Sequence, residues 1–430
     1  MRLAIIGSGI SGLVCAHRLC QEHDITLFES GDYLGGHTNT IDVELDGEHH
    51  AVDTGFIVFN DWTYPNFIAL LNELGVASQP TSMSFSVQDG LSGLEYNGTS
   101  LNGLFAQRRN LFRPAFYRML KDILRFNREA PAVLEAEDSE QETVATFLAK
   151  HDYSTQFVRH YLLPMGAAIW SCPPTTFEQF PIRFIVEFYR NHGILNLWNR
   201  PTWRVINGGS RTYVEAIRRQ FQGTIHLNTP IMSAERFSDR VELTDAQQRI
   251  HSFDEVIFAC HSDQALTILR DASPTERELL TAFPYEPNTA VLHTDISVLP
   301  KRKRAWAAWN YRLHSGGVHK ATVTYNMNIL QHIDSSHTFC VTLNDTTGID
   351  ESKVLRRIQY AHPIFTTNRA AAQQRHQDVI RKNRTSFCGA YWGYGFHEDG
   401  VKSAINVCRA FDSSTDSVPP GFRRKEASHA

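Results

Sequence analysis

The sequence of 430 residues lacks several features that would assign it to a simple class. It has no uninterrupted apolar run of the roughly 18 to 20 residues that a helix needs to cross a bilayer. Its 42 Lys and Arg residues nearly balance 46 Asp and Glu residues, so the net charge of −4 gives no general attraction to nucleic acid. Hydrophobic residues make up 42% of the chain, a globular composition that excludes low-complexity disorder. At roughly 150 residues per domain, the length predicts two or three domains.

Cysteine is sparse and irregularly placed. The seven cysteines include no C-x-x-C pair, so their spacing supports neither a disulfide framework nor a zinc site. The apolar start of the chain is short for a secretory signal, and a reducing, cytoplasmic setting is the default expectation. The H-E-x-x-H pattern and the nucleophile elbow of serine hydrolases are also absent. We therefore expect no metal ligands and no hydrolase chemistry.

The strongest positive signal lies at the start of the chain. Residues 3–6 are a continuous apolar run, typical of a buried parallel strand, and residues 13–20 have helical character. Between them lies a G-x-G-x-x-G motif made of Gly7, Ser8, Gly9, Ile10, Ser11 and Gly12. In this motif the first glycine allows a tight turn, the second lets a pyrophosphate approach the backbone, and the third lets helix and strand pack closely. The helix N-terminus then offers unpaired N–H groups to phosphate.

An acidic residue follows the next predicted strand, residues 24–28. Glu29 lies at the distance from the glycines at which a carboxylate accepts hydrogen bonds from ribose hydroxyls. Strand, glycine loop, helix, strand and acid in this order predict a dinucleotide-binding fold. The alternative for the three glycines alone is an ordinary turn before a helix.

A glycine doublet favours FAD over NAD as the cofactor. The sequence from Glu29 through Gly35 and Gly36 to His37 resembles the extended motif of the flavin-linked amine oxidase and phytoene desaturase superfamily. The resemblance implies that this loop lies against the FAD diphosphate and that a later segment passes beside the isoalloxazine. The residues that it assigns to FAD in these segments are Ser30, Gly35, Gly36, His37, Thr38, Asp53, Thr54, Gly55 and Phe56.

Further matches to the superfamily order lie in the middle and near the end of the chain. Ile231 falls at the position whose backbone touches adenine in that superfamily. Residues 387–400 form a strand and a glycine-rich turn before a helix that we expect over residues 401–410. The resemblance implies that the N-terminus of this helix points at the flavin and stabilises negative charge on its reduced form. It assigns Glu398, Asp399, Gly400 and Val401 to FAD binding.

These matches predict an α/β fold in which a Rossmann-like FAD-binding domain of the glutathione-reductase type is interleaved with an α+β substrate domain. The predicted FAD-binding domain comprises residues 1–75, 200–265 and 376–411. The predicted substrate-binding domain comprises residues 76–199 and 266–375. Residues 412–430 are rich in Ser, Pro and charge and are expected to be disordered.

The predicted reaction is the transfer of a hydride from an apolar substrate, at a C–H or C–N bond, onto flavin N5. Residues 203–214 and 395–400 resemble a bacterial branch of FAD-binding oxidoreductases whose genes often neighbour cyclopropane-fatty-acid synthase-like methyltransferases. That resemblance implies a fatty-acyl or other lipid substrate. His397 replaces an aromatic residue of the amine oxidases, so it weakens the case for an amine and is the candidate for acid–base or positioning work. Candidate pocket walls are Tyr391, Trp392 and Tyr394.

The sequence alone leaves two other functional classes open. A NAD(P)-dependent dehydrogenase would use the same glycine motif, although the doublet and the closing helix argue against it. A non-catalytic lipid-binding or escort protein of this fold would lack the complete flavin motif. The expected partner is a hydrophobic small molecule or lipid, not nucleic acid, and the sequence gives no signal for an oligomeric state. The basic run Lys301–Arg304 is either a solvated loop or a site of contact with anionic lipid, which would place the protein peripherally at the inner face of the membrane.

Overall fold

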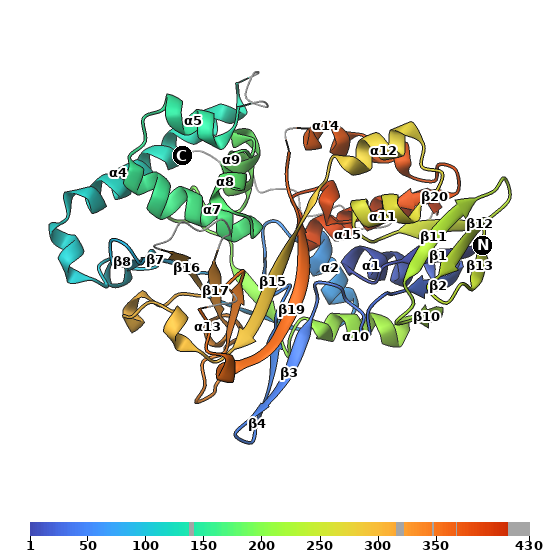
Figure 1. The fold of residues 1–430 in the computed structure, drawn as a ribbon, viewed down its shortest axis with the longest axis horizontal. Helices are drawn as coiled ribbons and strands as arrows, with labels where there is room; N and C mark the ends of the chain where they lie inside the picture. Colours follow the sequence, from blue (N-terminus) through green and yellow to red (C-terminus); the bar gives the residue numbers. More distant parts are fainter. Residues whose placement is uncertain (137–141, 315–321, 346–347, 367, 412–430) are drawn as a thin grey trace.

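Five short parallel strands, collected from distant parts of the chain, form one sheet of the computed structural model (Figure 1). The structure describes residues 1–136, 142–314, 322–345, 348–366 and 368–411. The strands of the parallel sheet, in their order across it, are β10 (Thr224–His226), β2 (Asp24–Phe28), β1 (Arg2–Ile6), β14 (Glu255–Phe258) and β20 (Thr385–Phe387). All four pairings are parallel, which confirms the expected α/β class with a Rossmann-like sheet.

Both faces of this sheet are covered, and the central strand β1 is accordingly apolar and buried from Leu3 to Ile6. Leu3 and Ile5 pack into a core beneath three helices, α1 (Ile10–Leu19), α10 (Arg211–Gln220) and α15 (His397–Phe411). Ala4 and Ile6 face the opposite core. That core is covered by the antiparallel strands β11 (Ile231–Arg236), β12 (Val241–Asp245) and β13 (Ile250–Phe253), and by the helices α11 (Ser262–Ile268) and α12 (Pro274–Thr281).

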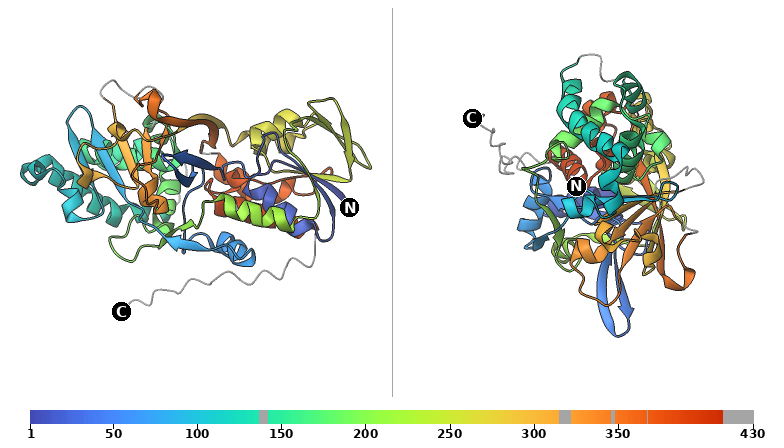
Figure 2. Two further views of the ribbon diagram at one scale, coloured as in Figure 1. Left: turned by 90° about the horizontal axis from the view of Figure 1, so that it is seen from below. Right: turned by 90° about the vertical axis from the view of Figure 1, so that its left-hand side faces the viewer.

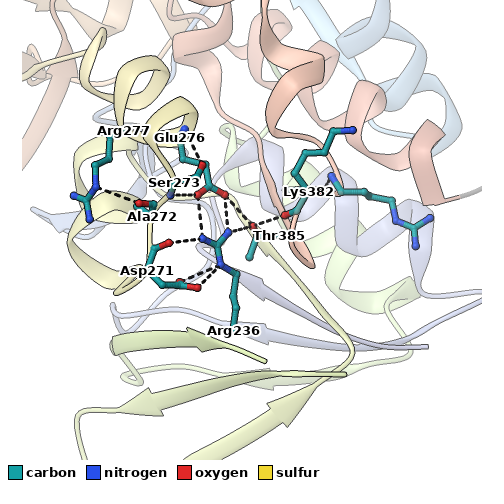
Figure 3. Close-up of polar contacts among 10 residues, drawn as sticks. Arg236, Asp271, Ala272, Ser273, Glu276, Arg277, Lys382 and Thr385 are labelled. Carbon is teal, nitrogen blue, oxygen red and sulfur yellow. Dashed lines mark hydrogen bonds and ion pairs between the residues drawn. The ribbon is translucent and has the colours of Figure 1, made fainter. Parts of the chain in front are cut away.

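A buried ion-pair network joins these covering elements to the parallel sheet (Figure 3). The guanidinium of Arg236, at the end of β11, donates to both carboxylate oxygens of Glu276, at 2.6 and 3.0 Å. It also donates to the carboxylate of Asp271 at 3.0 Å and to the hydroxyl of Thr385, on β20, at 3.0 Å. The Arg236 and Glu276 side chains are only 5% and 2% exposed. Removal of Arg236 would therefore leave the buried Glu276 carboxylate without its counter-ion.

A second, seven-stranded sheet lies at the other end of the elongated molecule (Figure 2). Its strands, in order, are β19 (Val354–Pro363), β15 (Tyr285–His293), β18 (Cys340–Leu343), β17 (Val323–Asn326), β16 (Trp309–Leu313), β7 (Phe85–Asp89) and β8 (Leu94–Asn97). Every pairing is antiparallel except β16 with β7. The long strands β15 and β19 extend between the two halves (Figure 1).

Helices cover one side of this mixed sheet and enclose a core rich in aromatic side chains. The helices here are α4 (Pro114–Glu129), α5 (Val144–Lys150), α7 (Leu163–Trp170), α9 (Ile182–Asn191) and the short α8 (Pro174–Phe177). Phe177 and Phe180 are buried in this core, whereas Phe188 also reaches a cavity described below. The aromatic stripe of residues 177–189 thus serves mainly as core.

Smaller elements complete the chain. The two-stranded hairpin of β3 (Thr40–Leu45) and β4 (Glu48–Asp53) projects from the middle of the molecule (Figure 1). A small sheet contains β5 (Phe59–Asn60), β9 (Trp203–Ile206) and β6 (Ser78–Pro80). The remaining α-helices are α2 (Pro65–Glu73), α3 (Leu101–Leu104), α6 (Thr155–Phe157), α13 (Met327–Gln331) and α14 (Arg369–Gln374). Short 3₁₀ turns include η1 (Arg108–Phe112), η2 (Ala130–Leu134), η5 (Ile296–Val298), η6 (Lys303–Ala305), η7 (Glu351–Lys353), η8 (His376–Val379) and η9 (Ala390–Trp392), and η4 (Val158–Leu162) is a π-helical turn.

The closing helix differs from its expected start. It begins at His397 rather than at residue 401, because the N–H groups of Asp399 and Gly400 already bond to the carbonyl of Phe396. The domain boundaries stay a prediction, and the tail expected to be disordered, residues 412–430, lies outside the described residues. Within the described ranges, no helix is long and apolar enough to cross a membrane.

Candidate active site

A cavity of about 930 Å³ extends from the glycine-rich loops of the parallel sheet to the face of the mixed sheet. Its lining includes most of the glycine motif and both residues of the doublet. The residues expected to bind FAD that line it are Gly7, Ser8, Gly9, Ile10, Ser11, Glu29, Ser30, Gly35, Gly36, His37, Gly55 and Phe56. The motif residues of distant segments therefore meet in one space.

The first glycine loop has the geometry of a phosphate cradle. A Cβ atom added to Gly9 would meet no atom within 4 Å, because this position faces open space. A Cβ added to Gly12 would lie 2.0 Å from the carbonyl oxygen of Gly7, so helix α1 packs directly on the turn that precedes it. Gly12 itself does not line the cavity. Gly9 thus leaves open space at the cavity, and Gly12 allows the close packing of helix on turn.

The glycine doublet lies against this cradle. The Gly35 N–H donates to the carbonyl of Ser8 at 3.0 Å, and a Cβ added to Gly36 would lie 3.2 Å from the Cα of Gly9. Gly36 also has a φ of +58°, a conformation that glycine adopts without strain. The second loop therefore completes the wall of the space that Gly9 faces.

Glu29 fixes the loop while its carboxylate faces the cavity. One carboxylate oxygen accepts from the Ser8 N–H at 2.9 Å, and the other accepts from the Gly31 N–H at 2.8 Å. The residue follows β2 directly, at the carboxyl end of a parallel strand, where ligands of such sheets bind. This is the placement that a ribose-binding carboxylate requires.

The groups present fit a flavin dinucleotide. No side chain caps the N-terminus of α1, and its first turn contains no acidic residue, so its N–H groups are available to a diphosphate. In the described structure, Nε2 of His37 is buried on the cavity wall without a hydrogen-bond partner. An open cradle, an uncapped helix and an orphaned imidazole nitrogen all suit a polar ligand that spans both loops.

The four expected site residues at the end of β4, residues 53–56, differ in whether they face the cavity. Gly55 and Phe56 line the cavity, whereas the side chains of Asp53 and Thr54 are buried behind it. Asp53 accepts from the Thr40 hydroxyl at 2.6 Å and from the Ser210 N–H at 2.9 Å. Burial raises the pKa of Asp53 to about 6. Its carboxyl group therefore joins the β3–β4 hairpin to the start of α10, a role that the sequence did not indicate.

His397 lies on the cavity wall within a network of hydroxyl groups. Its Nε2 is 2.9 Å from the hydroxyl oxygen of Thr38 and 3.1 Å from that of Tyr213. The imidazole stacks on Phe56, with ring centroids 3.4 Å apart and planes inclined by 13°. Burial, with a smaller effect of His37, holds the pKa of His397 well below its ordinary value. A neutral imidazole held in this way positions Phe56 and the doublet loop.

The four residues after His397 face away from the cavity and hold the first turn of α15 in place. Glu398 accepts from the N–H groups of Asn66 and Phe67, at 3.2 and 2.9 Å, and burial raises its pKa to about 7. Asp399 accepts from the Phe396 N–H at 3.0 Å, and burial raises its pKa to about 6. Both carboxyl groups therefore act on backbone donors at this junction.

Helix α15 packs directly on the glycine motif. The hydroxyl of Ser11 donates to the carbonyl of Gly400 at 2.9 Å, and a Cβ added to Gly400 would lie 2.6 Å from a side-chain carbon of Ile10. Val401 is buried in the core beneath α1. The closing motif thus places the N-terminal ends of α1 and α15 together, and only His397 of its first turn reaches the cavity.

The other expected site residues separate by side-chain direction. Tyr391 and Tyr394 line the cavity. Trp392 instead stacks on His376, with ring centroids 4.2 Å apart, because successive residues of the turn η9 point in different directions. Ile231 is buried at the start of β11 and is not part of the lining.

Two histidines that sequence reasoning missed join His37 on the wall. His37 lies 5.0 Å from His362 and 6.4 Å from His261 between ring centroids. Burial lowers the pKa of His37 and of His261 to about 4, and that of His362 to about 3, with a smaller effect of the neighbouring imidazoles. One signal was readable, since His261 closely follows a parallel strand, β14. Nothing in the sequence paired it with His362, on β19.

The far part of the cavity is a chamber with aromatic walls. Its large lining side chains are Phe85, Tyr96, Tyr161, Met165, Ile169, Trp170, Phe188, Trp309, Tyr325, Phe365 and Tyr394, and we call this part the aromatic chamber. Along the whole described lining, Glu29 and Arg200 are the only Asp, Glu, Lys or Arg residues. Glu29 belongs to the nucleotide end, and Arg200 is exposed. The chamber itself is therefore uncharged. No group of His, Cys, Asp and Glu among the described residues is arranged to hold a metal ion.

Comparison with known proteins agrees with this geometry. Over 96% of this chain and 99% of theirs, two solved structures have the same fold with a TM-score of 0.68: a putative protoporphyrinogen oxidase from Exiguobacterium sp. 255-15, at 16% identity, and cyclohexylamine oxidase from Brevibacterium oxydans IH-35A, at 15%. A fatty acid isomerase from P. acnes that produces CLA covers the same shares at a TM-score of 0.65 and 14% identity. No curated protein matches the sequence.

The sequence model of the flavin containing amine oxidoreductases matches residues 10–320, which is most of the chain. This match confirms the superfamily resemblance and FAD as the cofactor, and it sets aside the NAD(P)-dependent and non-catalytic alternatives. The chain belongs to the family of flavin-containing amine oxidoreductases and is an FAD-dependent oxidoreductase.

Proposed function

We propose that the protein removes a hydride from an uncharged carbon chain, of the fatty-acyl or another lipid class, held in the aromatic chamber. The neighbouring carbon releases a proton to water, and a C=C double bond forms between the two carbons. Bound FAD supplies the hydride acceptor, N5 of its ring. The observation that carries the proposal is the continuity of the cavity, whose lining passes from the glycine loops to the chamber without a break. A substrate in the chamber is thereby adjacent to the cofactor end.

The charge of the lining supports an apolar substrate. Besides Glu29 at the nucleotide end, no carboxylate faces the described cavity, so a cationic diamine would have no counter-ion in the chamber. The histidines on the wall are neutral near pH 7, since burial lowers the pKa of each of them, to about 4 in the case of His192. Apolar surface, in contrast, is favourably buried against aromatic walls.

A single cation at the rim suits a substrate with a carboxylate head. Arg200 lines the cavity and is exposed, and its Nε donates to the carbonyl of Asn196 at 2.8 Å. Its remaining guanidinium N–H groups can pair with a carboxylate there while an acyl chain occupies the chamber. One solved protein of this fold is a fatty acid isomerase, which is compatible with the same substrate class.

The protein's own groups orient the reactants and exclude water. His397, held by Thr38 and Tyr213, keeps Phe56 on the wall between the nucleotide end and the chamber. The first turn of α15 brings the positive end of its helix dipole to the same wall, where negative charge is stabilised. Tyr394 and Phe188, whose ring centroids lie 5.7 Å apart, form part of the chamber wall. These contacts supply positioning and a dry site.

The test is anaerobic bleaching of the flavin absorbance of the purified protein. A free fatty acid or a phospholipid with an acyl chain of suitable length should bleach it, and admitted oxygen or another acceptor should restore it. Mass spectrometry of lipids incubated with the enzyme should then reveal a product lighter by two hydrogens. Bleaching by putrescine and not by any lipid would overturn the proposal. Bleaching by a neutral alkylamine alone would move the reaction from a C–H to a C–N bond.

A further inference from the structure

Exposed apolar side chains cluster in the segment that follows the cavity wall at β8. Phe112 is 86% exposed and Leu101 is 77% exposed, although both are large and apolar. Leu111 and Tyr117 are also more than 40% exposed. Side chains of this size are rarely exposed together on a monomer without a partner.

Basic side chains surround these apolar residues. The segment 96–121 contains five Arg or Lys residues and no acidic residue, although the chain as a whole has a net charge of −4. Four further basic residues come from a distant segment. The nine basic residues are Arg108, Arg109, Arg113, Arg118, Lys121, Lys301, Arg302, Lys303 and Arg304. In the described structure only Arg302 forms an ion pair, with Glu95, so eight positive charges lack an acidic partner.

The two segments form one surface. The turn η6 packs against both β8 and α3, and the Asn97 amide donates to the carbonyl of Trp306 at 2.8 Å. The N–H of Lys301 donates to the carboxylate of Glu95, on β8, at 3.1 Å. This places the basic run beside α3 and its exposed Leu101, at the end of the molecule that is marked by β8 and α4 in Figure 1. We call residues 101–121 together with 301–304 the basic apolar surface.

We propose that the basic apolar surface docks the protein onto an anionic lipid bilayer. Basic residues near a membrane are attracted by anionic headgroups, and exposed Phe, Leu and Tyr side chains enter the headgroup and acyl boundary. A nucleic acid would account for the charges but not for Phe112 and Leu101, whose exposed side chains offer it no hydrogen bonds. The combination of charge and apolar surface therefore favours the bilayer.

One end of the cavity lies beside the basic apolar surface. Gly98 and Thr99 line the cavity, are exposed, and are separated from α3 and its exposed Leu101 by Ser100 alone. The cavity thus reaches the outside at the edge of the basic apolar surface. A docked protein would open toward the lipid at this edge. The docking itself rests on the surface alone and holds whatever the enzyme oxidises.

The test is co-sedimentation with lipid vesicles, with vesicles of phosphatidylcholine alone compared with vesicles that also contain phosphatidylglycerol. The holoenzyme should sediment with the anionic vesicles and not with the neutral ones, and added salt should release it. The Lys301→Glu/Arg304→Glu variant should bind the anionic vesicles at least about tenfold more weakly. Phe112→Ser should weaken binding without changing the charge.

Matched controls keep the result specific. Arg218→Glu/Arg219→Glu on α10 makes the same charge change elsewhere, and Ile250→Ser removes an exposed apolar side chain from β13. Both should bind like the unaltered protein, and all variants should retain flavin and their circular dichroism spectra. Failure of the holoenzyme to sediment with anionic vesicles, or equal losses in the controls, would overturn the proposal. So would tight binding to duplex RNA or DNA that Phe112→Ser leaves unchanged.

Discussion

The two ends of the cavity are built from different materials. At the nucleotide end, the wall is backbone and small side chains, and its key contacts join Ser8, Gly9, Gly35 and Gly36. In the aromatic chamber, the wall consists of large side chains that come mainly from the mixed sheet and the helices that cover it. A backbone wall suits a fixed, charged cofactor, whereas a side-chain wall can change with the substrate. Sequence motifs can therefore identify the nucleotide end more readily than the chamber.

The largest expected effect is the loss of bound flavin from a substitution at the nucleotide end of the cavity. Gly9→Val fills the open space beside the glycine doublet, so the diphosphate should lose its place and flavin should no longer copurify. Gly98→Val is the matched control, because a Cβ there also meets nothing within 4 Å but lies at the chamber end. Flavin absorbance per chain measures both. Normal flavin content in Gly9→Val would show that the diphosphate lies elsewhere.

The next effect is a loss of stability in the nucleotide half of the molecule, caused by a substitution outside the cavity. Arg236→Ala leaves Glu276 buried without its cation (Figure 3), which should lower the free energy of unfolding by about 3–5 kcal/mol. The double variant Arg236→Met/Glu276→Leu removes both charges and should recover most of that loss. Urea unfolding measures the three proteins. A double variant as unstable as the single one would show that the charges themselves are not the cause.

A pH effect is expected where the two ends meet. Burial lowers the pKa of His362 from 6.5 to about 3, so the unfolded state binds its proton first as pH falls. Each such histidine should therefore reduce the free energy of unfolding by about 1.4 kcal/mol per pH unit below about pH 6.5. Asp53 and Asp399, with pKa values raised to about 6, act in the opposite sense between about pH 4 and 6.

The His362→Asn variant isolates the histidine from these carboxyl groups. Urea unfolding at pH 7 and at pH 5 should give a smaller difference for the variant than for the unaltered protein, because one protonation step has been removed. His332→Asn, at an exposed site on the chamber side, serves as the control. Identical pH dependence of all three proteins would mean that His362 is not buried as a neutral group.

The smallest of these effects is a test of His397 as a positioning residue. His397→Gln should lower kcat/KM by roughly tenfold, through loss of the stacked contact with Phe56, and should change KM less than kcat. Because the pKa of His397 lies well below 6.5, the pH profile between pH 6 and 8 should keep its shape in the variant. Loss of an inflection in that range would instead assign proton transfer to His397.

Much of the nucleotide end could be predicted from the sequence because its determinants are local. The glycine motif, Glu29 and the doublet all lie within residues 7–36, where spacing fixes geometry. Side-chain direction was not readable in the same way. Asp53 and Trp392 belong to segments of the expected order, yet their side chains point to Ser210 and His376 rather than to the cavity.

The chamber could not be predicted for a physical reason. Its wall combines residues of β7, β8, η4, α7, α9, β16 and β17, which approach one another only through tertiary packing. Met165 and Ile169, for example, lie one helical turn apart on α7, a pattern common to any buried helix face. The basic apolar surface likewise depends on the contact of η6 with α3, although its two basic segments are each visible in the sequence.

The glycine loops and the aromatic chamber are two ends of one cavity, and a ligand titration of the holoenzyme can test this continuity. Binding of a long-chain fatty acid should shift the flavin absorption spectrum. Ile169→Leu should keep this affinity, while Ile169→Glu, which places a carboxylate in the chamber, should lower it at least about tenfold with flavin content unchanged. Equal affinities in all three proteins, or no spectral shift at saturating ligand, would contradict the claim.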